Sequence, residues 1–121
     1  MQKTILVVED SPEAREMISF ILAHEGYSVI TAEDGLAALQ ILKENEADLI
    51  ITDIQMPNLD GIEMIKRLRN GYNSRAVPIL VMSAFSSTAT QAALDAGANR
   101  SAAKPMQVES LLRLVCQLLA N

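Results

Sequence analysis

The chain has 121 residues, the common size of one domain and enough to bury a hydrophobic core without disulfides or a structural metal. Its formal net charge is −5 and no run of Lys or Arg concentrates positive charge, which disfavours direct binding of nucleic acid. The uninterrupted apolar runs are too short to span a membrane, and the N-terminus lacks the long apolar region of a signal peptide. We therefore expect a cytoplasmic protein.

Five short apolar or β-branched runs alternate with longer segments of helical period. The expected strands are residues 5–8, 28–32, 49–52, 79–82 and 101–103. This alternation is typical of α/β proteins with a parallel sheet. The first, third and fourth runs are almost entirely apolar, as expected for strands covered on both faces, whereas the second and fifth are more polar and are predicted to be edge strands.

The helical segments carry recognisable start and stop signals. Ser11 is a candidate N-cap followed by Pro12 at the first helical position, and Gly26 ends this first helix. Asp34 and Asp60 are candidate caps of the second and third helices. In the first and last helices the residues predicted to face the sheet are Ala14, Met17, Ile18, Ile21, Leu22, Val108, Leu111, Leu112, Val115, Leu118 and Leu119.

With right-handed crossovers, the five strand–helix units predict a doubly wound five-stranded parallel sheet of flavodoxin-like order 2-1-3-4-5, with helices on both faces. Ligands of such a sheet bind beyond the carboxyl ends of the strands, at the switch point between strands one and three. The last helix runs almost to Asn121, so we expect residues 1–121 to form one domain with no output domain. Cys116 lies in this helix and is predicted to be a small core residue.

Polar residues stand directly after four of the five expected strands. Glu9 and Asp10 follow the first, Asp53 the third, Ser83 the fourth and Lys104 the fifth. Since parallel strands share one carboxyl edge, these side chains should meet there, and three carboxylates beside a single Lys call for a divalent cation. Oxygen ligands suit Mg²⁺. A metal, an ammonium group and a hydroxyl around a carboxylate are typical of phosphoryl transfer, with Asp53 as the nucleophile.

Over essentially its whole length the chain resembles the receiver domains of two-component response regulators. The matching motifs are Glu9-Asp10, Asp53-Ile54-Gln55-Met56-Pro57-Asn58-Leu59-Asp60-Gly61, Ser83-Ala84 and Lys104-Pro105, the last of which is similar to the family's cis-prolyl turn. The resemblance implies that Asp53 is the phosphoacceptor. It also implies that Asp10, Asp53 and the carbonyl of Gln55 bind Mg²⁺ directly, with Glu9 acting on the metal largely through water.

The same resemblance implies roles and partners for the remaining residues. Ser83 and Lys104 would contact the phosphoryl oxygens. The donor would be a phosphohistidine on a sensor histidine kinase or a histidine phosphotransfer protein, and the receiver would signal by phosphorylation-dependent binding of another protein. Such a domain catalyses only its own phosphorylation and dephosphorylation. His24, at the end of the first helix, is expected on the surface and is not such a donor.

The chain departs from the family at Ser101, three residues before Lys104, where the family usually has Tyr or Phe. In the family this ring turns inward when the Ser or Thr hydroxyl moves toward the phosphoryl group. A serine has no ring to move. We therefore expect phosphorylation to change mainly the loop of residues 84–88 and to affect Ser101 only weakly.

Two other protein classes share features with this pattern. Flavodoxins have the same strand order, but a flavin phosphate needs a loop rich in hydroxyls and glycine, whereas residues 9–13 are acidic and would repel it. Phosphatases of the dehalogenase type place their aspartates two apart after the first strand, which this chain does not. Within the receiver interpretation we favour a free-standing regulator over a domain excised from a longer protein.

Overall fold

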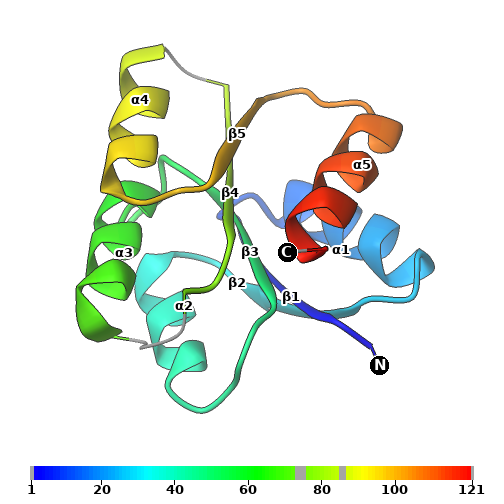
Figure 1. Cartoon of the computed structure of the whole chain (residues 1–121), viewed down its shortest axis with the longest axis horizontal. Helices are drawn as coiled ribbons and strands as arrows, with labels where there is room; N and C mark the ends of the chain where they lie inside the picture. Colours follow the sequence, from blue (N-terminus) through cyan, green and yellow to red (C-terminus); the bar gives the residue numbers. More distant parts are fainter. Residues whose placement is uncertain (1, 73–75, 85–86, 121) are drawn as a thin grey trace.

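The computed structural model describes residues 2–72, 76–84 and 87–120, which form a parallel sheet between two layers of helices (Figure 1). The strands are β1 (Thr4–Val8), β2 (Ser28–Ala32), β3 (Leu49–Asp53), β4 (Ile79–Ser83) and β5 (Arg100–Ala103). The helices are α1 (Pro12–His24), α2 (Gly35–Leu42), α3 (Gly61–Arg67), a short π-helical turn η1 (Leu68–Tyr72), α4 (Ser87–Ala96) and α5 (Val108–Leu119).

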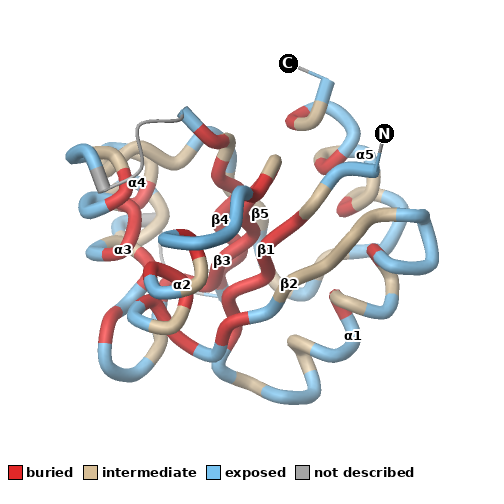
Figure 2. The backbone as a smooth tube through the Cα atoms, turned by 90° about the horizontal axis from the view of Figure 1, so that it is seen from below, coloured by how far each residue is buried: buried red, intermediate tan, exposed pale blue. Residues whose placement is uncertain are grey.

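The sheet has the order β2-β1-β3-β4-β5, and every neighbouring pair is parallel. The predicted fold class and strand order are therefore confirmed. Successive side chains of a strand point to opposite faces, so Ile5 and Val7 pack with α1 and α5, while Leu6 and Val8 pack with α2 and α3. The buried residues of β1, β3 and β4 run through the centre of the molecule in Figure 2.

The helix starts have the predicted caps. The side chains of Ser11, Asp34 and Asp60 each accept a hydrogen bond from the backbone N–H three residues later, at 3.4, 2.8 and 2.9 Å respectively. Each such cap stabilises a helix by about 1 kcal/mol. The caps of α2 and α3 also fix the start of each helix close to the carboxyl edge of the sheet.

Three side chains predicted to lie in the core are exposed instead. Met17 is 64% exposed and Val108 is 47% exposed, and the thiol of Cys116 is free and exposed as well. Adjacent residues of a helix are about 100° apart around its axis, which carries Met17 away from the buried Ile18. Cys116 is turned away from the buried Val115 in the same way. Val108 is the first residue of α5, where the helix has only begun to cover the sheet.

His24 is exposed, as predicted, with 75% of its side chain accessible. Within the part of the chain that the structure describes, every helix is too short or too polar to cross a lipid bilayer.

Candidate functional site

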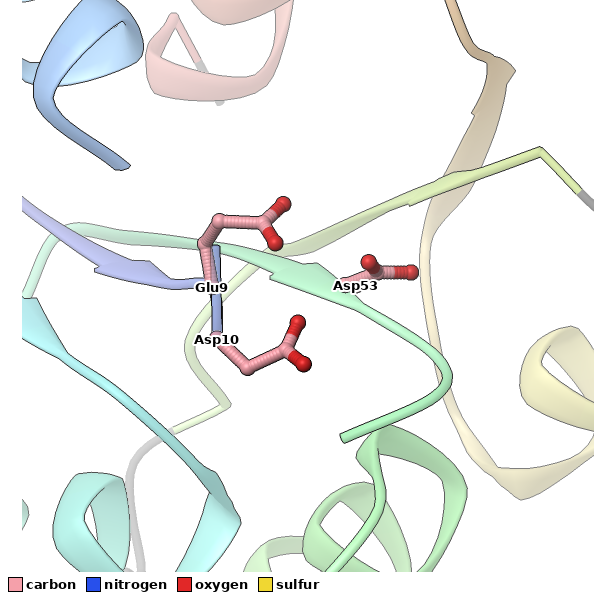
Figure 3. A group of neighbouring side chains, drawn as sticks. All are labelled: Glu9, Asp10 and Asp53. Atoms are coloured by element: carbon pink, nitrogen blue, oxygen red, sulfur yellow. The ribbon is translucent and has the colours of Figure 1, made fainter. Parts of the chain in front are cut away.

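Three acidic side chains converge at the carboxyl edge of the sheet (Figure 3). Glu9 and Asp10 directly follow β1, and Asp53 is the last residue of β3, one residue beyond the predicted end of that strand. One carboxylate oxygen from each of the three residues lies within 4.8 Å of the other two. Because β1 and β3 are neighbours in the sheet, residues more than forty positions apart supply a single acidic cluster.

Lys104 supplies a positive charge to this cluster. Its Nζ donates to Glu9 Oε1 at 2.7 Å and to Asp53 Oδ2 at 2.9 Å. Burial alone would lower the pKa of Lys104, but its hydrogen bonds and charge attraction to Glu9 and Asp53 outweigh that effect and raise the pKa above the ordinary lysine value. Lys104 therefore stays an ammonium ion and holds the two carboxylates together.

Backbone N–H groups orient the two buried carboxylates. Glu9 is only 3% exposed and Asp53 only 9%. Ser11 N donates to Glu9 Oε2 at 3.1 Å, and Ile54 N donates to Asp53 Oδ1 at 2.6 Å. With Lys104 on the other oxygen of each residue, both carboxylates have fixed orientations, which is a requirement for a nucleophile or a metal ligand.

The exposed side of the cluster offers oxygen atoms that could hold a metal ion. Asp10 is exposed and, with Gln55, Met56, Pro57 and Asp60, lines a surface depression beside the carboxylates. Asp10 and Asp53 offer carboxylate oxygens, Gln55 can offer its backbone carbonyl, and the open depression admits water. This set of hard oxygen ligands fits Mg²⁺, which retains several of its waters when it binds to proteins.

Ser83, predicted to contact the phosphoryl group, and Ser101, at the position where the family usually has an aromatic ring, lie on β4 and β5. Ser83 is buried and is the last residue of β4, and its carbonyl accepts a hydrogen bond from Lys104 N at 3.0 Å. Ser101 lies on β5 opposite Val81 and is half-buried. The peptide bond between Lys104 and Pro105 is cis, in agreement with the resemblance in that motif. Residues 85 and 86 of the loop expected to change on phosphorylation lie outside the described residues.

Two further contacts at this edge were not predicted from the sequence. Arg15 Nη1 on α1 donates to the backbone carbonyl of Glu9 at 2.8 Å. Asn58 Nδ2 donates to Asp34 Oδ2 at 2.7 Å and thereby connects the loop after β3 to the start of α2. The sequence indicates Asp34 as a helix cap, and Asn is a residue type common in turns. No sequence pattern, however, pairs Asp34 with Asn58, which lies 24 positions later.

The comparisons with known proteins agree with this geometry. Residues 5–116 match the family model described as the response regulator receiver domain. The response regulator MprA of a Mycobacterium species is 40% identical over 98% of the chain, and the response regulator GtcR of Aneurinibacillus migulanus is 38% identical over the same share. The chain spans about half the length of these curated relatives, 51% and 48% respectively.

Solved structures with the same fold cover both chains almost completely. A response regulator from Chloroflexus aurantiacus has a TM-score of 0.94 at 34% identity, and each chain is covered completely. The receiver domain of the sensor histidine kinase PA1611 from Pseudomonas aeruginosa has a TM-score of 0.92 at 30% identity, again over the whole of both chains. That structure holds a magnesium ion coordinated in its active-site cleft.

Proposed function

Because the chain belongs to the response regulator receiver domain family of two-component signalling, we propose that Asp53 accepts a phosphoryl group in a Mg²⁺-dependent reaction. Glu9, Asp10, Asp53 and the carbonyl of Gln55 would hold the metal, Glu9 largely through water. The observation that carries this proposal is the cluster of carboxylates within 4.8 Å of one another, with Lys104 joining two of them.

The chemistry is an in-line displacement at phosphorus. A carboxylate oxygen of Asp53 attacks the phosphorus atom of a phosphohistidine on a sensor histidine kinase or a histidine phosphotransfer protein. As the new O–P bond forms, the P–N bond breaks, and the imidazole keeps the electron pair and is protonated as it departs. Bound Mg²⁺ would supply positive charge to the phosphoryl oxygens.

Side chains of this domain do the remaining work. Lys104 already contacts Asp53 and would transfer its hydrogen bonds to the phosphoryl oxygens, where its charge offsets theirs. The hydroxyl of Ser83, at the end of the neighbouring strand, would donate to another phosphoryl oxygen.

The domain would catalyse only its own phosphorylation and dephosphorylation, and it would signal by phosphorylation-dependent binding of another protein rather than of nucleic acid. That residues 1–121 act as a free-standing receiver remains a prediction, since the curated relatives are about twice as long.

The direct test uses a small phosphodonor. Incubation with acetyl phosphate and Mg²⁺ should add the mass of one phosphoryl group, which hydroxylamine removes because the product is an acyl phosphate. Asp53→Asn should abolish the mass increase, whereas Asp95→Asn, at an exposed position on α4, should retain it. Persistent modification of the Asp53→Asn protein would place the nucleophile elsewhere.

A further inference from the structure

Asp34 and Asn58 connect two loops that stand side by side at the carboxyl edge of the sheet. Asn58 Nδ2 donates to Asp34 Oδ2 at 2.7 Å, and Asp34 is only 6% exposed. The other carboxylate oxygen, Oδ1, accepts from Ala37 N at 2.8 Å and caps α2. Asp34 thus uses one oxygen for its own helix and the other for the loop that follows β3.

The two hydrogen bonds also favour the charged form of the carboxylate. The backbone N–H of Ala37 and then the amide of Asn58 lower the pKa of Asp34 below its ordinary value, against the opposite effect of burial. Hydrogen bonds to a charged acceptor are stronger than neutral ones. The contact between Asp34 and Asn58 is therefore a charge-assisted one and does more than fill space.

A second contact brings the same two segments together. Gly35 N donates to the carbonyl of Leu59 at 3.0 Å. A Cβ atom at Gly35 would lie 2.5 Å from that carbonyl oxygen, closer than any side chain allows. The loop after β3 therefore lies directly against Gly35, the first residue of α2. Asp34 precedes Gly35 and Asn58 precedes Leu59, and the hydrogen bond between the side chains of Asp34 and Asn58 holds the loop in this position.

This loop contains the carbonyl of Gln55 and is short and closed. Gly61 N donates to the carbonyl of Ile54 at 2.8 Å, so residues 54–61 return on themselves. Within the loop Asn58 has φ of +67°, a left-handed conformation in which Asn is tolerated better than most residues. A shift of Asn58 would pass through two peptide units to Pro57 and Met56, and so would displace Gln55.

We propose that Asp34 and Asn58 are positioning residues for the metal site: their hydrogen bond holds the loop after β3 so that the carbonyl of Gln55 faces Asp10 and Asp53. This inference rests on the proposed function, because it assigns these residues to the binding of Mg²⁺. In this role neither residue would touch the metal or the phosphoryl group. Partners that orient a metal ligand from behind typically change metal affinity by about 10- to 100-fold when they are removed.

One single substitution weakens the contact and another removes it, while each preserves one other feature. Asp34→Asn retains an oxygen for the N–H of Ala37, and Asn is as good an N-cap as Asp, but the negative charge is lost, and Asn58 must turn its amide over to accept a neutral, weaker hydrogen bond from the new amide. Asn58→Gly removes the side chain and keeps a residue that adopts positive φ easily, with no change of charge. Asp95→Asn, with the same loss of charge on α4, is the matched control for the first substitution.

The reciprocal double substitution, Asp34→Asn with Asn58→Asp, restores the contact with its direction reversed. The new amide at position 34 caps α2 through its oxygen and donates to the new carboxylate at position 58, and the net charge equals that of the wild type. The single substitution Asn58→Asp, in contrast, places two carboxylates opposite each other. Because like charges repel, it should be the most damaging of the set.

The experiment is titration of each protein with Mg²⁺ by isothermal calorimetry, with circular dichroism of the metal-free proteins as a check on the fold. We expect Kd for Mg²⁺ to rise about 10-fold in Asn58→Gly and by less in Asp34→Asn, and to return to within about twofold of the wild type in the double substitution. The Asp95→Asn control should bind like the wild type. A role confined to stabilising the fold would lower the melting temperature and leave Kd unchanged.

The outcomes separate this inference from the function on which it rests. A wild-type protein that fails to bind Mg²⁺ would overturn the proposed metal site itself. A wild type that binds Mg²⁺, with Asn58→Gly folded and equal in affinity, would overturn the positioning role alone. If Asp34→Asn unfolds, the decision passes to Asn58→Gly and to the double substitution, which retains both hydrogen bonds.

Discussion

The ammonium group of Lys104 lies 2.9 Å from Asp53 Oδ2, although the two residues are 51 positions apart and Asp53 ends β3 whereas Lys104 follows β5, a strand that is not adjacent to β3. Lys104 follows β5 and reaches past the end of β4 to the end of β3. Its backbone N–H donates to the carbonyl of Ser83, which fixes the start of this reach. The backbone of Lys104 is thus held at the end of β4, while its ammonium group contacts Asp53 at the end of β3.

Lys104→Met should slow phosphorylation of Asp53 by acetyl phosphate by roughly 10²-fold, because the loss of one fixed donor to a developing anion has an effect of this size. Methionine retains most of the apolar stem, so the packing changes little. The rate is measured by intact-protein mass spectrometry over time. Lys66→Met, at an exposed position on α3, is the matched control and should phosphorylate at the wild-type rate.

The pH dependence of stability should report the same contact. Because the pKa of Lys104 is raised in the folded protein, its stabilising contribution is complete below the ordinary lysine value of 10.5 and disappears as the pH rises through the folded-state pKa. The difference in free energy of unfolding between wild type and Lys104→Met, measured with urea, should therefore be constant at neutral pH and shrink above about pH 10.5. A difference that grows with pH would contradict the contact.

Mg²⁺ should stabilise the folded protein, since a bound cation relieves repulsion among Glu9, Asp10 and Asp53. At a concentration tenfold above Kd the stabilisation is about 1.4 kcal/mol, or roughly 3–6 °C in melting temperature. Asp10→Asn should reduce this rise, because Asp10 is the exposed carboxylate of the three. Asp95→Asn should leave it intact. A wild-type melting curve that is indifferent to Mg²⁺ would count against the metal site.

Ser83→Ala should retain Asp53 as the phosphorylation site but slow the transfer by removing one donor to the phosphoryl oxygens. The substitution removes one oxygen atom and retains the backbone hydrogen bond from Lys104 N to the carbonyl at position 83, so the fold should persist. Ser110→Ala on α5 serves as the control, and both rates come from the acetyl phosphate time course. Equal rates in the two variants would show that Ser83 has no part in the transfer.

Ser101 should take little part in the response to phosphorylation. An aromatic ring at this position could bury or expose more than ~100 Å² when it turns, whereas a serine moves almost no surface. Amide chemical shifts should therefore change mainly in the loop of residues 84–88, and Ser101→Ala should leave phosphorylation-dependent partner binding intact. Shift changes centred on β5, or loss of that binding in Ser101→Ala, would refute this expectation.

The amino-acid sequence by itself determined the sheet and the placement of its chemistry. Apolar runs such as the one in β3 are long enough only for strands, and their alternation with helical segments leaves few parallel topologies with right-handed crossovers. In a parallel sheet with this strand order, the residues at the carboxyl ends of the strands share one edge. The sequence alone therefore predicts that Glu9, Asp53 and Lys104 lie close together. The caps Ser11 and Asp34 were equally predictable, because capping depends on local backbone geometry.

Only the tertiary structure decided which side chains at the margins of the apolar helix faces are buried, and which polar groups of different loops are in contact. The period of a helix places Met17 and Cys116 near an apolar face, but their exposure depends on how far the neighbouring elements extend over them. The contact between Asn58 and Asp34 likewise depends on the path of two loops, which have no repeating pattern to read. Periodicity is a property of the chain, whereas contact between distant loops is a property of the packed fold.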